Sequence, residues 1–494
     1  MGSLRRFSGV VVGCVTLGAV HFAAADWPQW RGANRDARAT DFKAPQEWPK
    51  ELTAAWKAPV GDGVSSPAIV GDRIYVFSRE GGDEVTRCLD ATSGKEVWSE
   101  KYPAQAVNGA DSGFPGPRAS PAVGEGKVVT LGVQGTLSCV DAESGKKLWR
   151  KDDYQGKVPR FHTASSPIIV DGMVIAQLGG PQNGVIAAYD LGSGEQKWKW
   201  EGDSPGYASP VVMTVGGEKL IVTETEGAIV AVRAADGKLA WQTPFRPQGM
   251  GYNAATPVVD NDTLIYAGSG RGARAVKLAK DGDKFEAKEL WSNPDTSVQF
   301  SSPVLKDGKL YGLTQGNDLF CIDAGSGKTL WTAPAPAAQG GMGGPGGPGG
   351  RGRGPGGGPG GPGGGPGGPG GPGRGPGAQG GPGGPGGPGG AGPGGPGGPG
   401  GRGGPGGPGG GGPGGRGMRG GGGGRGGYGS VVDAGSVLLA LTPASELVVF
   451  KPGETYSEVA KVKVSENPTH AYPVLSGNRL IIKDKDSVIA YNVQ

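Results

Sequence analysis

The sequence is poor in the residue types that build haem attachment sites and metal centres. Its 494 residues include four cysteines and three histidines, and it contains neither a Cys-x-x-Cys-His motif nor two adjacent cysteines. Only His162 and His470 lie beyond the first 25 residues, and neither has a second histidine or a carboxylate at ligand spacing. We therefore expect no haem c and no metal site.

Long apolar runs are equally scarce. The one clear run extends from Phe7 to Phe22, after Arg5 and Arg6 and before Ala23-Ala24-Ala25. This order is typical of a secretory signal peptide, so we predict cleavage after Ala25 and a periplasmic or secreted protein. A lipoprotein signal with a lipid anchor on Cys14 is the alternative interpretation. No other stretch approaches the roughly 20 apolar residues of a transmembrane helix.

Residues 335–427 contain almost no apolar side chains and consist mainly of Gly-Pro units of irregular length. The irregular phase excludes a collagen triple helix, and the composition predicts a disordered insert. The whole chain has a net charge of +4, but the insert and the signal peptide together carry nine arginines and no acidic residue. The remainder is net negative, so we expect no nucleic-acid partner.

Tryptophan marks an internal repeat of 40 to 51 residues, which is the range expected for propeller blades. We predict that each ring packs between neighbouring blades. The tryptophans of this repeat are Trp56, Trp98, Trp149, Trp198, Trp241, Trp291 and Trp331.

Two further motifs accompany the tryptophans. A Ser-Pro or Thr-Pro step opens the first strand of each of the first six units, as in Ser66-Pro67 and Thr256-Pro257. A turn of the form Asp-x-x-Ser-Gly-Lys, such as Asp90 to Lys95, precedes the strand that carries the tryptophan. Aspartate can bond the turn backbone, and glycine supplies the left-handed conformation that the turn needs. The third and fourth strands of a blade are therefore expected to meet at this turn.

The last unit lacks a fourth strand, whereas the segment around Trp56 is a fourth strand without a blade. Pairing the two ends would close a circle and remove an exposed edge. We therefore predict an all-β, eight-bladed propeller of four-stranded antiparallel blades. The predicted parts are a signal peptide (1–25), an extension (26–50), the closing strand with blades 1 to 6 (51–334), the insert (335–427) and blades 7 and 8 (428–494).

Cysteine occupies one repeated position, two residues before the turn aspartate, in Cys88, Cys139 and Cys321. The equivalent residues of other units are alanines: Ala188, Ala231, Ala275 and Ala490. A position that accepts either residue indicates packing of a small side chain. Thiols on separate blades should also lie too far apart for a disulfide.

The Asp-x-x-(Ser/Thr)-Gly-Lys-x-x-Trp repeat resembles the pyrroloquinoline-quinone-type repeat of the quinoprotein propeller family. The opening Asp26-Trp27-Pro28-Gln29-Trp30-Arg31-Gly32 looks like the start of exported members found in planctomycete bacteria. The family includes quinone-dependent dehydrogenases and the non-enzymatic outer-membrane assembly protein of the BamB type. For a dehydrogenase, the resemblance implies a quinone, Ca²⁺, a catalytic aspartate and a pair of adjacent cysteines. This sequence lacks that pair.

In a propeller, the residues that lead into each innermost strand line one mouth of the central channel. Here they are mixed aromatic and polar, as in a carbohydrate or peptide site. The candidate binding residues are Arg118, His162, Tyr207, Tyr252, Asn253, Gln299, Phe300 and His470.

These observations favour a non-catalytic, monomeric scaffold that binds a protein or polymer, without a cofactor and with no catalytic residue assigned. One alternative is a dehydrogenase dependent on the quinone and Ca²⁺ with a divergent site. The other is a structural surface or matrix protein that uses the Gly/Pro-rich insert.

Overall fold

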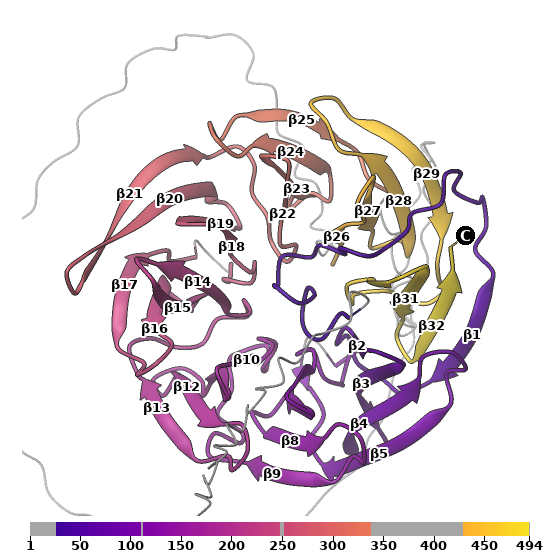
Figure 1. Ribbon diagram of the computed structural model, residues 1–494, viewed down its shortest axis with the longest axis horizontal. Helices are drawn as coiled ribbons and strands as arrows, with labels where there is room; N and C mark the ends of the chain where they lie inside the picture. The colour runs from indigo at the N-terminus through magenta and orange to yellow at the C-terminus, as the bar shows by residue number, and fades with distance from the viewer. Residues whose placement is uncertain (1–25, 110–111, 248–250, 337–427, 494) are drawn as a thin grey trace, which may run out of the picture. The chain divides into compact units, whose positions relative to one another are not determined.

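The computed structural model describes residues 26–109, 112–247, 251–336 and 428–493. Within these ranges the chain is all-β, and its strands form eight four-stranded antiparallel sheets arranged in a ring (Figure 1). The prediction of an eight-bladed propeller is confirmed. The predicted signal peptide and nearly all of the predicted insert lie outside the described residues.

The first four blades follow one another along the chain, each with its innermost strand first. Blade 1 contains β2 (Ala68–Val70), β3 (Arg73–Glu80), β4 (Asp83–Asp90) and β5 (Glu96–Pro103). Blade 2 contains β6 (Ala122–Gly124), β7 (Lys127–Leu131), β8 (Leu137–Asp141) and β9 (Lys147–Lys151). Blade 3 contains β10 (Ile168–Val170), β11 (Met173–Leu178), β12 (Val185–Asp190) and β13 (Gln196–Trp200). Blade 4 contains β14 (Val211–Val215), β15 (Glu218–Glu224), β16 (Ala228–Arg233) and β17 (Leu239–Pro244).

The last four blades complete the ring. Blade 5 contains β18 (Val258–Asp260), β19 (Thr263–Gly268), β20 (Gly272–Asp281) and β21 (Lys284–Asn293). Blade 6 contains β22 (Val304–Lys306), β23 (Lys309–Leu313), β24 (Leu319–Asp323) and β25 (Thr329–Ala333). Blade 7 contains β26 (Ser430–Asp433), β27 (Leu438–Leu441), β28 (Glu446–Lys451) and β29 (Ser457–Lys463). Blade 8 contains β30 (Val474–Ser476), β31 (Arg479–Lys483), β32 (Ser487–Asn492) and β1 (Ala54–Pro59).

The middle strands of each blade form the core. Strand β27 reads Leu-Leu-Ala-Leu and is buried throughout, because both faces of its sheet are covered by neighbouring blades. The outermost strands alternate between exposed and partly buried residues, as in β5 and β29. Each blade therefore buries its apolar side chains against the next one around the ring.

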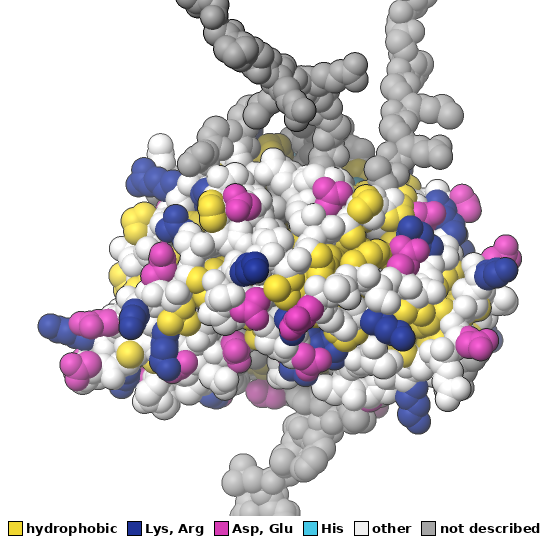
Figure 2. All heavy atoms as spheres, turned by 90° about the horizontal axis from the view of Figure 1, so that it is seen from above, with side chains coloured by type: hydrophobic (Ala, Val, Ile, Leu, Met, Phe, Trp, Pro, Cys, Tyr) yellow, Lys and Arg dark blue, Asp and Glu magenta, His cyan; other side chains and the backbone are white. Residues whose placement is uncertain are grey.

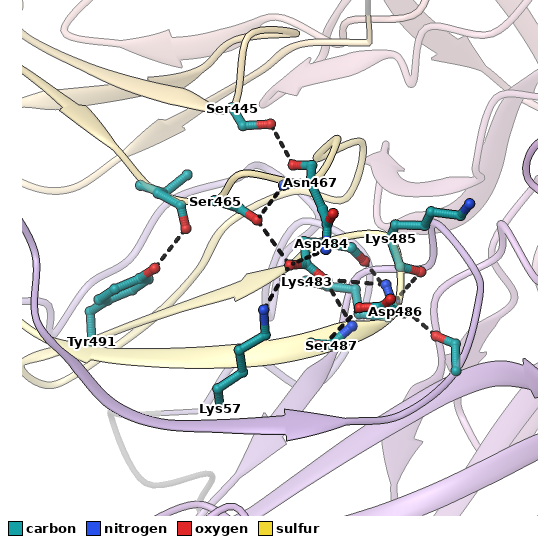
Figure 3. A network of polar contacts seen from close by, with 12 residues as sticks. Lys57, Ser445, Ser465, Asn467, Lys483, Asp484, Lys485, Asp486, Ser487 and Tyr491 are labelled. Carbon is teal, nitrogen blue, oxygen red and sulfur yellow. Dashed lines mark hydrogen bonds and ion pairs between the residues drawn. The ribbon is translucent and has the colours of Figure 1, made fainter. Parts of the chain in front are cut away.

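The two chain ends pair as predicted. Strand β1 runs antiparallel to β32, and Trp56 lies opposite Ala490. Next to this seam, the buried Lys483 ammonium donates hydrogen bonds to the carbonyl oxygens of Asp484 and Lys485 (Figure 3). It also donates to the carbonyl oxygens of Gly61 and Gly63. Lys57 of β1 reaches the Asp484 carboxylate across the seam at 3.6 Å. Polar contacts thus join the last blade to the segment that leads into the first.

Blade 5 lacks the turn motif because its third and fourth strands continue into a longer hairpin. Strands β20 and β21 have ten residues each and pair from Ala273 opposite Asn293 to Asp281 opposite Lys284. Phe285 of this hairpin is buried in a cluster with blade 4 residues, and the Arg233 guanidinium lies 5.7 Å from the centre of its ring. The extra length therefore packs against blade 4.

The N-terminal extension lies against the innermost strands. It enters the middle of the ring as the indigo trace of Figure 1, and Trp27 forms an isolated bridge with Ile69 of β2. Within the described residues, no helix is long and apolar enough to cross a membrane.

Candidate functional site

The Ser-Pro and Thr-Pro steps form a closed circle of hydrogen bonds around the channel. The backbone N–H of Ser66 donates to the Ser120 hydroxyl, and the same contact links each step to the next as far as Ser302. The Ser302 N–H then reaches the hydroxyl of Tyr472 in blade 8, and the Tyr472 N–H donates to Ser66. The donor–acceptor distances range from 2.8 to 3.3 Å. This hydroxyl circle holds the leading segments of seven blades at one level.

Seven rings lie on the leading segments beside this circle. We call them the aromatic array: Phe114, Phe161, Tyr207, Tyr252, Phe300, Tyr428 and His470. Tyr252 contacts Phe161 edge-on at 4.9 Å between ring centres, and Phe300 stacks on Tyr428 at 4.3 Å. Tyr428 in turn stacks on His470 at 4.8 Å. The array continues without a gap from blade 3 to blade 8 and on to Phe114, ahead of blade 2.

The structure brings together four of the predicted binding residues, namely Tyr207, Tyr252, Phe300 and His470. Arg118 lies close enough to influence the ionisation of both His470 and Tyr207. Gln299 is half-buried beside Phe300 in the sequence, and His162 is buried with a left-handed backbone (φ 64°). The binding role of the eight predicted residues therefore remains a prediction.

Sequence reasoning missed Phe114, Phe161 and Tyr428. Phe161 directly precedes His162, and Phe114 lies four residues before Arg118. Tyr428 is the first described residue after the insert, and no Ser-Pro step follows it before the first strand of blade 7. A search for aromatic residues within eight positions before each first strand would have found all three.

Most polar groups beside the rings are already used within the protein. The Tyr207 hydroxyl accepts the Phe161 N–H at 3.1 Å. Asn253 is buried, and its amide donates to the carbonyl oxygens of Thr225 and Phe245 while accepting from Arg271. What remains accessible is chiefly the surface of half-buried rings, which suits contact with apolar and aromatic groups.

Burial also controls the charge of this face. Desolvation, with a smaller contribution from the Arg118 cation, lowers the pKa of His470 to about 4. Desolvation raises the pKa of Tyr207 to about 12. Both side chains are therefore uncharged at neutral pH, and His470 is a poor candidate for a general acid at that pH.

The tryptophans join blades at the outer end of the turn motif. The Trp98 indole donates to the carbonyl oxygen of Ala142 in the next blade, and Trp149, Trp198 and Trp291 make the equivalent bond. A Cβ atom on Gly145 would lie 2.5 Å from the Trp98 ring, and this glycine has φ 71°. Glycine is thus required both for the turn and for the close approach of the indole. Trp56 and Trp331 also donate to the following blade, whereas Trp241 packs beside the long blade 5 hairpin.

The three cysteines pair across the sheet with these tryptophans. Cys88, Cys139 and Cys321 lie opposite Trp98, Trp149 and Trp331, and all three are free and buried. Desolvation raises their thiol pKa values to about 11, 12 and 11. Ala188, Ala231, Ala275 and Ala490 occupy the same register opposite Trp198, Trp241, Trp291 and Trp56. The position is limited to small residues because an indole covers it.

Comparison with known families decides the relationship. A family model described as outer membrane protein assembly factor BamB matches residues 46–181 and 82–333, which together span more than half of the chain. The chain belongs to the BamB family. The expected resemblance is confirmed at that level, while the likeness to exported proteins of planctomycete bacteria remains a prediction.

Individual relatives include both assembly factors and enzymes. The BamB protein of Burkholderia pseudomallei is 27% identical over 348 residues, or 67% of this chain and 80% of the relative. The quinohemoprotein alcohol dehydrogenase of Comamonas testosteroni is 27% identical over 261 residues, or 50% of this chain but only 34% of that enzyme.

Solved structures with a similar fold also include both a BamB protein and an enzyme. BamB from Moraxella catarrhalis has a TM-score of 0.54 at 13% identity, covering 89% of this chain and 97% of that one. The quinohemoprotein alcohol dehydrogenase ADHIIG from Pseudomonas putida has a TM-score of 0.57 at 12% identity, covering 95% and 80%. At these identities the likeness shows the fold alone.

The side chains of the array do not fit the Ca²⁺ ion that a quinone-dependent dehydrogenase requires. Ca²⁺ prefers six to eight oxygen ligands, largely from carboxylates and carbonyls. The seven rings of the array supply three phenol hydroxyls and no carboxylate. Throughout the part of the chain that the structure describes, no three His, Cys, Asp or Glu side chains gather as a metal site.

Proposed function

We propose that this BamB-family chain is an exported, non-catalytic scaffold whose aromatic array binds a segment of a partner protein. The observation that carries the proposal is the array itself, seven contacting rings on the segments that lead into seven of the eight blades. Several relatives are named outer membrane protein assembly factors, which supports a protein partner and a periplasmic location. Cleavage after Ala25 would leave Asp26 as the first residue.

The chemistry of the array favours a peptide segment over a carbohydrate. Sugars need many free hydrogen-bonding groups, whereas the Tyr207 hydroxyl and the Asn253 amide are bonded internally. Half-buried rings instead suit aromatic, aliphatic or proline side chains, which gain from contact with ring faces and edges. A polymer other than protein is an outcome that the experiment below can detect.

Site-specific photocrosslinking tests the proposal. A photoreactive phenylalanine analogue is placed at Tyr252 of the full mature chain or, as a control, at Leu290, which is 46% exposed on outer strand β21. In an envelope extract of the source organism, we expect a discrete protein adduct from position 252 only. A carbohydrate adduct, or no adduct at position 252, would contradict a protein partner.

The captured protein is then purified and titrated with the wild type, Phe300→Ser and Leu290→Ser. Loss of one hot-spot ring should weaken binding at least tenfold, while the outer-strand substitution should have little effect. Circular dichroism shows whether each variant is folded. Equal effects of the two substitutions would place the contact elsewhere.

The alternative functions have their own readouts. Incubation with pyrroloquinoline quinone and Ca²⁺ should produce neither a bound absorbance band nor dye-linked alcohol oxidation, and either signal would overturn the non-catalytic assignment. Deletion of residues 335–427 should leave partner binding intact. If surface assembly is lost while thermal unfolding is unchanged, the matrix function is favoured.

A further inference from the structure

The N-terminal residues 26–43, which we call the plug, occupy the channel on the side opposite the aromatic array. The Asp26 carboxylate accepts the N–H of Gly71, and the Lys43 N–H donates to the carbonyl of Gly477. Gly71 and Gly477 lie in the hairpin turns at the far ends of the innermost strands β2 and β30. From there, Trp30 reaches the hydroxyl circle and donates to the Thr256 hydroxyl at 3.1 Å.

The plug is hydrogen-bonded to every blade. The Pro28 carbonyl accepts the N–H of Val123 in blade 2, and Ala37 and Ala39 bond the backbone of Asp433 in blade 7. Trp27 reaches blade 1, Trp30 reaches blade 5, and the remaining blades are reached by two arginines. One short segment therefore contacts the whole circumference of the ring.

Arg31 is 1% exposed and is directed towards blades 6 and 8. Its guanidinium donates to the carbonyl oxygens of Ser302 (2.8 Å) and Pro303 (2.6 Å) and to the Tyr472 hydroxyl (3.1 Å). The planar fork of the guanidinium thus spans a complete Ser-Pro step.

Arg35 is 2% exposed and is directed towards the opposite side of the channel. It donates to the carbonyl oxygens of Ser166 (3.2 Å), Pro167 and Pro210 (2.8 Å), which belong to blades 3 and 4. Desolvation lowers its pKa to about 9, so the guanidinium remains charged at neutral pH. Carbonyl oxygens and the Gln29 side chain, rather than a carboxylate, accept its hydrogen bonds.

The Ser-Pro steps explain why the channel accepts cations. Proline has no N–H, and the serine or threonine N–H of each step donates to the next blade in the hydroxyl circle. The inner edge of each first strand has no neighbouring strand, so its carbonyl oxygens face the channel and are available to the plug. The repeated motif therefore produces a channel lined with acceptors, and five guanidinium donors per arginine match it.

The backbone of the plug is tightly coiled. Arg31, Arg35 and Ala37 all have left-handed backbones, with φ of 60°, 58° and 59°. Non-glycine residues adopt this region at a cost, and such conformations persist where surrounding contacts impose them. Gly32 (φ 83°) completes the coil, and a Cβ atom there would lie 3.3 Å from the Trp27 ring.

We infer that the carbonyl oxygens of the Ser-Pro steps in blades 3, 4 and 6 form a guanidinium-binding site, and that residues 26–43 are its intramolecular ligand. The chemical class that the site recognises is a peptide segment with two arginines spaced four residues apart. Because the two guanidiniums bind opposite sides of the channel, both sets of bonds form only when the ring is closed. The plug therefore locks the closed circle, independently of any partner at the array.

A cleavable full chain tests this inference. A protease site replaces the exposed residues around Glu47, between the plug and β1, and the folded protein is cut there. We expect the fragment to stay bound through gel filtration. The Arg31→Lys/Arg35→Lys variant should release it at least tenfold faster, because lysine cannot form the forked contacts. Arg38→Lys is the matched control, since the Arg38 side chain is 52% exposed and its contact is an ion pair with the Asp433 carboxylate, not a bond to a Ser-Pro carbonyl.

A second measurement needs no variant protein. A labelled synthetic peptide of residues 26–43 is exchanged into the cut wild type, in competition with unlabelled peptides. The Arg31→Lys/Arg35→Lys peptide should compete at least tenfold less well than the wild-type or Arg38→Lys peptide. Equal competition by all three peptides, or immediate loss of the wild-type fragment after cutting, would overturn the inference.

Discussion

The buried Lys483 ammonium provides a sharp test of the seam that closes the ring. Its side chain is 1% exposed, and desolvation lowers its pKa from 10.5 to about 8, despite the attraction of Asp484 and Asp62. In the unfolded chain this pKa returns to its ordinary value. Between pH 8 and pH 10.5 the unfolded state therefore binds a proton that the folded state does not, and stability rises with pH.

The size of the effect follows from the shift. One pKa unit corresponds to about 1.4 kcal/mol, so the free energy of unfolding should increase by about 3 kcal/mol between pH 7 and pH 10.5 from this group alone. Below pH 8 both states are protonated, and the cost of burying the charge is present in full. Lys483→Met removes the charge and hence this part of the pH dependence.

Guanidinium chloride unfolding followed by tryptophan fluorescence measures the difference. Other groups titrate over the same range, so the informative quantity is wild type minus Lys483→Met at each pH. Lys485→Met, at an exposed neighbour on the same turn (Figure 3), is the matched control for the substitution itself. A wild-type minus Lys483→Met difference that stays constant from pH 7 to pH 10.5 would refute the argument that burial lowers this pKa.

Three further predictions concern the blades and the array. Trp198→Phe should lower the free energy of unfolding by about 1–3 kcal/mol, because it leaves the Ala234 carbonyl without its hydrogen-bond donor. Trp200→Phe, at a half-buried tryptophan on the same strand, should lower it less. Equal losses would contradict the role of Trp198 in joining neighbouring blades. The His470 imidazole should show no NMR titration above about pH 5, and a midpoint near 6.5 would mean that it is solvated. At pH 8 a thiol reagent should modify Cys88, Cys139 and Cys321 only after denaturation. Rapid reaction in the folded protein would be inconsistent with the burial of these thiols.

Local sequence patterns were sufficient for the ring. The spacing of Trp98 and Trp149, the turn glycines and the Ser-Pro steps each reflect a contact that recurs between neighbouring blades, so the period is visible in the chain. The pairing of the strand around Trp56 with the last blade was also predictable. The repeat showed one blade without a fourth strand and one fourth strand without a blade. The size limit at Cys88 and Ala188 likewise follows from a repeated pairing with an indole.

The contents of the channel were decided only by the tertiary structure. Arg31 and Arg35 lie more than 100 residues from the carbonyl oxygens of the blades that they bind, and no local pattern distinguishes them from exposed Arg38. In the same way, Phe114 and His470 become neighbours only because the ring closes. A propeller repeats its contacts between adjacent blades, whereas contacts across its centre occur once each, so their residues leave no period in the sequence.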